Sequence, residues 1–307
     1  MTMVRGSQSI CFQEAPYVIS AGSIVGKKEF EGPLGNLFDM SGEDNLFGEQ
    51  TWEAAESRMQ KEACVLALEK AGIGAKEVRY LYGGDLLRQG IATSMGVEAL
   101  QIPMFGLYGA CSTSGEALAL GSMAVAAGYG EYMLAVTSSH FGSAEKEFRF
   151  PLGYANQRPL SAHWTVTGSG AFLIGKKKSH VRVSGVTVGK IVDYGLKDSQ
   201  NMGACMAPAA CDTILFDLVR KKGKDIKQNH MDCGMTIFDQ QTQDTHAGGS
   251  GCGCAAVTLA AYILPKIESG EWRRVLFVPT GALMSTVSFN EGESVPGIAH
   301  GIVLEHC

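Results

Sequence analysis

The chain has 307 residues, with 31 acidic and 26 basic side chains and a formal net charge of -5. Nucleic-acid-binding domains usually carry a basic footprint, so this acidic balance excludes nucleic acid as an expected partner. Thirty-nine glycines against nine prolines indicate tight turns and close packing, not disorder. Because no apolar run is long enough to cross a bilayer and the first residues lack a secretory pattern, we expect a soluble protein of cytoplasmic type.

Cysteine usage indicates a reducing compartment. The nine cysteines are scattered, odd in number and mostly in apolar surroundings, which favours free thiols over a disulfide framework. Cys252 and Cys254 could form half of a metal site, but no second pair at finger-like spacing follows them. We therefore expect no metal and no cofactor.

The first hundred residues read as alternating strands and helices. Residues 16–26 are β-branched and lie between glycines, which predicts a strand, and residues 27–50 read as an extended polar loop. From Thr51 apolar residues recur at steps of three and four up to Gly72, which predicts a capped helix. A strand over 78–83 and a helix over 90–100 are expected to follow.

A sharp turn at Cys111 is the feature with the clearest chemistry. Small residues flank it, and residues 116–127 then read as a helix that ends at Gly128. A cysteine at a helix N-terminus is favoured as a thiolate and lies where an anion can bind. A small buried cysteine under a core helix is the alternative, and the local pattern leaves both open.

The region after the next strand, 132–137, is a long connection over residues 138–163. Connections of this length in compact domains are often binding loops. This one carries four candidate ligand-binding side chains, which are His140, Arg149, Arg158 and His163. A strand over 170–175 then ends the first half, and residues 176–178 are a surface turn of three lysines.

The second half repeats the first. The residues Gly-Glu-Tyr at 130–132 and Gly-Glu-Trp at 270–272 both precede a strand, and the same offset places Cys111 on Gly251. Repeated strand–helix units indicate a duplicated α/β architecture with two similar sheets, and ligand sites in such folds gather where the halves meet. We assign residues 16–178 to the first half and residues 179–304 to the second.

Three motifs resemble those of the thiolase-like superfamily. They are GACSTS at 109–114, MGACMAPAA at 202–210 and HAGGSG at 246–251. The resemblance implies a thiolase-like fold of five αβαβα layers and a homodimer.

Longer stretches resemble the stage V sporulation protein AD family of endospore-forming bacteria. They lie at 47–57, 137–140, 156–159, 161–164 and 243–254. This resemblance implies a protein that binds dipicolinic acid (pyridine-2,6-dicarboxylate), as the free acid or its calcium complex. It further implies a role in uptake of that compound into the developing spore and in its release in germination. The resemblance also implies that the protein works beside other proteins of the same operon, peripherally associated with the spore inner membrane.

Two departures from the thiolase pattern matter. Ile214 runs directly into Leu215, where a further strand is expected, which predicts that a segment is absent from the given residues at this point. Thiolases also carry an Asn-Glu-Ala-Phe motif and a late catalytic cysteine, and residues 239–242 and 290–293 stand in those places. The group that would handle a proton is therefore not visible.

A binding protein is the function that we expect, with no catalysis. A flat dianion needs cationic or N–H donors, for which Cys111 and His246 rank first, His140, His163 and Arg158 next, and Arg149 last. His140 could instead be a satisfied core histidine, and the arginines could pair with neighbouring glutamates.

Two other functions stay open. One is an active thiolase or ketoacyl-synthase-type acyltransferase, with Cys111 as nucleophile and His246 as base or donor. The other is a purely structural assembly partner, for which the chain offers a basic face of lysines at 221, 222, 224 and 227.

Overall fold

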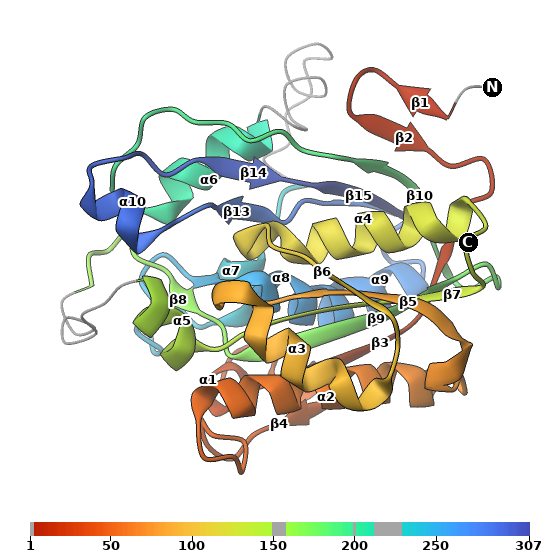
Figure 1. The fold of residues 1–307 in the computed structure, drawn as a ribbon, viewed down its shortest axis with the longest axis horizontal. Coiled ribbons are helices and arrows are strands. Elements are labelled where there is room, and N and C mark those ends of the chain that lie inside the picture. Colours follow the sequence, from red (N-terminus) through yellow and green to blue (C-terminus); the bar gives the residue numbers. More distant parts are fainter. Residues whose placement is uncertain (1–2, 149–157, 199–200, 212–228) are drawn as a thin grey trace.

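The structure is a computed structural model and describes residues 3–148, 158–198, 201–211 and 229–307 (Figure 1). The strands are β1 (Val4–Arg5), β2 (Ser9–Cys11), β3 (Tyr17–Val25), β4 (Met40–Ser41), β5 (Val78–Gly84), β6 (Met104–Gly106), β7 (Tyr132–Ser139), β8 (Trp164–Thr165), β9 (Gly168–Gly175), β10 (Val181–Thr187), β11 (Gly249–Ser250), β12 (Arg274–Phe277), β13 (Thr280–Ala282), β14 (Gly297–Ala299) and β15 (Gly301–His306). The helices are α1 (Lys27–Phe30), α2 (Trp52–Ala71), α3 (Ile91–Val97), α4 (Thr113–Ala126), α5 (Phe141–Phe148), α6 (Met202–Ala210), α7 (Cys233–Ile237), α8 (Cys252–Thr258), α9 (Leu264–Glu268) and α10 (Thr286–Asn290).

The first half forms a mixed sheet in the order β4-β3-β9-β7-β5-β6. β9 runs antiparallel to β3 and β7, whereas β5 runs parallel to β7 and β6. Helix α2 covers one face of this sheet and α4 and α8 cover the other. The carboxyl ends of β5 and β7 therefore point toward the N-termini of the helices that carry the candidate site.

The second half contributes β10, β15 and β12, which pair antiparallel in that order. Helices α4 and α9 also contact β10 and β15, so the helices lie between the two sheets and four layers can be traced. The fifth layer is expected from a helix that starts near residue 215, which lies outside the described residues. The two expected sheets are joined, because Val181 and Arg182 of β10 pair with Val18 and Tyr17 of β3.

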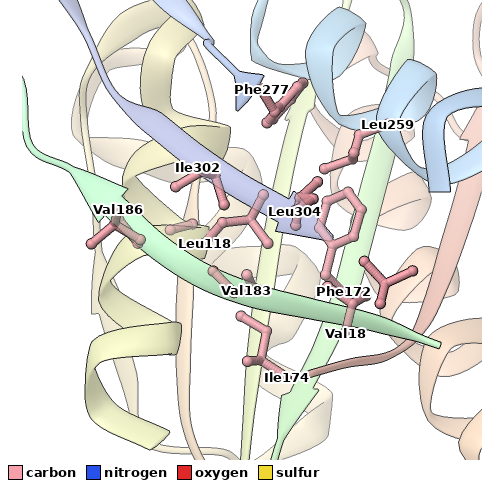
Figure 2. Packing of buried hydrophobic residues seen from close by; sticks show 14 of the residues in the cluster. Val18, Leu118, Phe172, Ile174, Val183, Val186, Leu259, Phe277, Ile302 and Leu304 are labelled. Atoms are coloured by element: carbon pink, nitrogen blue, oxygen red, sulfur yellow. The ribbon is translucent and has the colours of Figure 1, made fainter. Parts of the chain in front are cut away.

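The main core lies in this middle layer (Figure 2). Leu118 of α4 points between Phe172 of β9 and Ile302 of β15, and all three side chains are at most 1% exposed. Burial of large apolar side chains from both halves against the same helices holds the halves together. The boundary expected between residues 178 and 179 falls in the turn between β9 and β10 and stays a prediction.

The predicted helix after Thr51 is confirmed. The Thr51 hydroxyl accepts a hydrogen bond from the Ala54 N–H at 3.2 Å, and Gly72 ends the helix with a φ of 66°. The apolar periodicity was therefore a reliable guide to a helix of this length.

Two segments predicted as loops contain helices. Residues 27–50 include α1 and β4, and residues 138–163 include α5. α1 is short and polar, and it is held by tertiary contacts, because the buried Glu29 accepts a hydrogen bond from the Thr167 N–H at 2.9 Å. A four-residue helix leaves no periodic signal in the sequence.

Candidate functional site

Cys111 lies in a 3₁₀ turn, Ala110–Ser112, that leads directly into α4. Side chains tie this turn to itself, because Ser112 Oγ donates to the Gly109 carbonyl at 2.7 Å and Thr113 Oγ1 donates to the Ala110 carbonyl at 2.7 Å. Ala110 has a φ of 51°, in the left-handed region that residues with a side chain rarely adopt. The turn is thus a constrained structure that presents the half-buried Cys111 at the start of a 14-residue helix.

A small cavity of about 20 Å³ lies in front of Cys111. This volume accommodates about one water molecule. Its walls come from both halves, and the lining residues are Leu86, Ala110, Cys111, Ala144, Glu145, Thr165, Met202, Ser250, Ala282 and Met284. The cysteine therefore faces a hollow at the junction of the halves, as expected for a ligand site in a duplicated fold.

Behind this cavity, Leu86, Ala144 and Cys252 form a buried apolar cluster. The Cys252 thiol donates to the Ser138 carbonyl at 2.9 Å, and burial raises its pKa well above the usual range. Burial likewise raises the pKa of the Cys254 thiol. Both thiols of the Cys-x-Cys pair are therefore neutral core groups of α8.

A chain of buried hydrogen bonds continues from this cluster to two carboxyl groups. Ser138 Oγ donates to Glu56 Oε1 at 2.7 Å, and Gln60 Nε2 donates to Ser138 Oγ at 2.7 Å and to Thr93 Oγ1 at 2.9 Å. Thr93 Oγ1 in turn donates to Asp85 Oδ2 at 2.6 Å. Five side chains from α2, α3, β7 and the end of β5 thus form one network next to Leu86.

Burial raises the pKa of Glu56 to about 8, and the neighbouring Asp85 charge adds to this shift. Burial also raises the pKa of Asp85. The sequence analysis missed this network, although Glu56 and Gln60 sit four residues apart beside the apolar stripe of α2. The spacing of four residues between these two polar side chains, beside buried positions of the same helix, was the signal that could have indicated a buried polar network.

His140 is buried, and both of its ring nitrogens have backbone partners. It is 2% exposed, its Nε2 lies 2.7 Å from the Asn45 carbonyl, and its Nδ1 accepts the Gly142 N–H at 3.1 Å. Its ring stacks on Trp52, and burial lowers its pKa. His140 therefore holds the segment around Asn45 against α2 and does not line the cavity.

Arg158 and His246 meet at Asp244. Arg158 donates to Asp244 Oδ2 at 3.0 Å, and His246 Nε2 lies 2.9 Å from Asp244 Oδ1. His246 Nδ1 lies 2.9 Å from the Pro159 carbonyl, and the Arg158 guanidinium stands 4.8 Å from the centre of the Trp164 ring. The structure brings these two predicted residues together, but neither lines the Cys111 cavity.

The two-stranded ribbon of β8 and β11 separates this ion cluster from the cavity. Trp164 pairs with Gly249 and Thr165 with Ser250, and both Thr165 and Ser250 line the cavity. Because successive strand residues point to opposite faces, Trp164 and its Arg158 partner face away from the cavity.

His163 is not among the residues that line the cavity, and its ring lies beside Gly203 at the start of α6, where a side-chain carbon on that glycine would be 3.3 Å away. Arg149 lies outside the described residues, as do the lysines at 221, 222, 224 and 227. Glu145, Met202 and Met284 are lining residues that the sequence analysis did not single out.

The family model of stage V sporulation protein AD matches this chain over residues 6–218 and 214–305. The chain belongs to the stage V sporulation protein AD family. Stage V sporulation protein AD of Bacillus subtilis (strain 168) is 36% identical over 331 residues, which cover 98% of this chain and 98% of the relative.

The relative contains residues that this chain lacks. The aligned length of 331 shows this, since it exceeds the 307 residues of the chain. The family model also matches as two ranges that meet at residues 214–218, the place where the sequence analysis expected a missing strand. Both observations agree with that expectation, although the junction itself lies outside the described residues.

Several solved structures share this fold. OleA of Xanthomonas campestris with bound cerulenin has a TM-score of 0.57 at 13% identity and covers 97% of this chain and 99% of its own. The 3-oxoacyl-[acyl-carrier-protein] synthase III of Aquifex aeolicus VF5 has a TM-score of 0.51 at 14% identity, with 95% and 100% covered. These likenesses establish the thiolase-like fold of this sporulation protein.

Among the described residues, no group of three or more His, Cys, Asp or Glu side chains is arranged to hold a metal ion. None of the helices in the described ranges has the length and apolar character to span a bilayer.

Proposed function

We propose that this member of the stage V sporulation protein AD family is a non-catalytic binding protein for dipicolinic acid, which it holds in the hollow in front of Cys111. In this proposal it supports uptake of the compound into the developing spore and its release in germination. It acts as a homodimer beside other proteins of the same operon, peripherally associated with the spore inner membrane. The observation that carries the proposal is a cavity in front of Cys111, lined by residues of both halves, in a chain of this family.

The cavity must widen to accept such a ligand, because its volume of about 20 Å³ is far below that of an aromatic diacid. Met202, Met284 and Leu86 form part of its wall. Methionine side chains are unbranched and readily adopt new rotamers. These residues are therefore the part of the wall that we expect to move.

The charge of the lining favours the calcium complex over the free dianion. Among the described residues, the lining includes Glu145 but no lysine, arginine or histidine. A dianion buried without cationic partners is unfavourable, whereas calcium offsets the two carboxylates of the ligand. Arg158 and His246 of the predicted site then act from the far side of the β8–β11 ribbon, by holding its loops.

Acyl transfer is the second candidate, because one fold neighbour is a 3-oxoacyl-[acyl-carrier-protein] synthase III and Cys111 stands at the start of a long helix. It needs a base or donor beside the thiol. β13 and the residues after it present Ala282 and Met284 to the cavity, and both ring nitrogens of His246 have partners elsewhere. This lining supports binding over catalysis.

Calorimetric titration with dipicolinate, with and without calcium, tests the proposal. We expect saturable binding with calcium, a clear loss of affinity for a Cys111→Leu variant that fills the hollow, and an unchanged affinity for a Cys11→Ala control, whose thiol is exposed. An unchanged affinity of the Cys111→Leu, Cys111→Ala and His246→Ala variants would show that the pocket is misassigned. Turnover of an acyl-thioester that is lost on Cys111→Ala would establish the enzyme instead. The absence of both binding and turnover would favour a purely structural assembly partner.

A further inference from the structure

A second hollow, of about 560 Å³, opens at the other end of the first-half sheet. It is lined by Tyr17, Lys178, Ser179, His180, Arg182, His306 and Cys307. Gly175, just before the lysine turn, pairs with Tyr132 at the start of β7, whereas the Cys111 cavity adjoins residues beyond the end of β7. The eight residues of β7 separate the two hollows by about 26 Å, at roughly 3.3 Å per residue.

The lining of this second hollow, which we call the basic groove, contains two cations and two imidazoles but no acidic side chain. Glu305, whose strand neighbour His306 lines the groove, accepts hydrogen bonds from Arg182 Nε at 2.9 Å and Arg274 Nε at 2.5 Å. Burial acts to raise the pKa of Glu305, but the two arginines lower it, so that Glu305 is ionised.

One carboxylate therefore faces two guanidinium groups. Arg182, Glu305 and Arg274 lie opposite one another across β10, β15 and β12, and this row keeps an excess of one positive charge. Lys178 adds a second cation, and among the described residues it has no ion pair. The neighbouring Lys176 differs, because it pairs with Glu131 at 3.0 Å.

We propose that the basic groove is a binding site for a small dianion, whose carboxylate or phosphate oxygens are held by Lys178 and Arg182. The groups that surround the site are donors or can become donors, namely an ammonium, a guanidinium, two imidazoles and the Ser179 and Tyr17 hydroxyls, which suits an oxyanion. The volume lies within the range of small-molecule sites. The groove is a separate site from the Cys111 cavity and does not depend on the function proposed for that cavity.

Lys178→Glu tests this site, with Lys177→Glu as a matched control that makes the same charge change one residue away, outside the lining. Titration calorimetry of the full chain with inorganic phosphate and, separately, with dipicolinate gives the affinity. We expect saturable binding of at least one anion, a loss of about tenfold or more for Lys178→Glu, and a change of less than about threefold for Lys177→Glu. The two titrations distinguish a phosphate ligand from a carboxylate ligand.

The Cys111→Ala variant distinguishes anion binding at the basic groove from ligand binding at the Cys111 cavity. The groove should bind its anion with unchanged affinity in that variant. Equal losses for Lys178→Glu and Lys177→Glu would mean general charge attraction and would overturn the site. Absence of saturable binding of both anions would also overturn it. Dipicolinate binding that is lost on Cys111→Ala and unchanged on Lys178→Glu would support the Cys111 cavity and would assign no dipicolinate to the groove.

Discussion

Gly281 of β13 approaches Gly109 of the Cys111 turn so closely that a side-chain carbon on Gly281 would lie 2.2 Å from the Gly109 carbonyl oxygen. The same carbon would lie 3.2 Å from the Cys111 amide nitrogen. Because a contact to backbone cannot be relieved by a rotamer change, only glycine allows this approach. β13 from the second half thus fixes the position of the turn from the first half.

Replacing Gly281 by alanine should push β13 away from the turn and displace Ala282 from the cavity wall. We expect the free energy of unfolding to fall by about 2 kcal/mol or more, measured by chemical denaturation. Gly106→Ala is the control, because the nearest atom to its added carbon is 3.9 Å away at the flexible end of Met104. Equal stabilities of the two variants would contradict the close approach.

Stability should depend on pH through Glu29. Burial raises the pKa of Glu29 from 4.5 to about 7, against the effect of its hydrogen bond from the Thr167 N–H. Between these values the folded state holds a proton that the unfolded state has lost, so this group's contribution to stability is present below pH 4.5 and is lost as the pH rises toward 7. The contribution amounts to up to about 3 kcal/mol.

A Glu29→Gln variant should lack this loss, so its free energy of unfolding should gain on that of the wild type between pH 5 and 7.5. Denaturant titrations at several pH values measure the difference. Glu31→Gln, an exposed change at the end of the same short helix, should follow the wild type. Parallel curves for the wild type and the Glu29→Gln variant would show that Glu29 is not protonated in the folded protein.

His140 should affect stability and not ligand affinity. A His140→Ala change removes the partners of the Asn45 carbonyl and the Gly142 N–H and the stacking on Trp52, at a cost of about 2–3 kcal/mol. Thermal unfolding and dipicolinate titration of the same sample separate the two effects, with the exposed His230→Ala as control. A loss of affinity at unchanged stability would return His140 to the ligand site.

β12 has an edge that a further strand could cover, so added residues there should stabilise the fold. In the described part of the chain, β12 pairs only with β15, whereas β7, which the repeat places at the same position, pairs with both β9 and β5. Val275 and Leu276 of β12 are accordingly half-buried, while Leu134 and Val136 of β7 are at most 1% exposed. An unpaired edge also invites strand addition between molecules.

Inserting the additional residues of the Bacillus subtilis relative between Ile214 and Leu215 should therefore raise the melting temperature and reduce aggregation. The expected gain is several degrees, measured by thermal unfolding with light scattering. A glycine–serine insert of equal length at the same place controls for chain length. If both inserts behave alike, the relative's residues supply no strand here.

The sequence by itself determined the long elements, the duplication and the family. The strands β3, β7 and β9 and the helices α2 and α4 are long, largely apolar runs bounded by glycines or capping residues, and the family motifs are contiguous in the chain. The position of Cys111 at the start of a helix follows from its small neighbours and the uninterrupted helical run after them. These features depend on residues close together in sequence.

Only the tertiary structure decided what surrounds Cys111. Arg158 and His246, predicted beside the thiol, are held by Asp244 on the other face of the β8–β11 ribbon. Successive residues of a strand face opposite sides, so Thr165 faces the cavity while Trp164, which contacts Arg158, faces away from it. The wall instead comes from Ala282, on a strand more than 160 residues away in the chain. Such contacts depend on how whole sheets and helices pack, and packing over this separation leaves no local pattern in a single sequence.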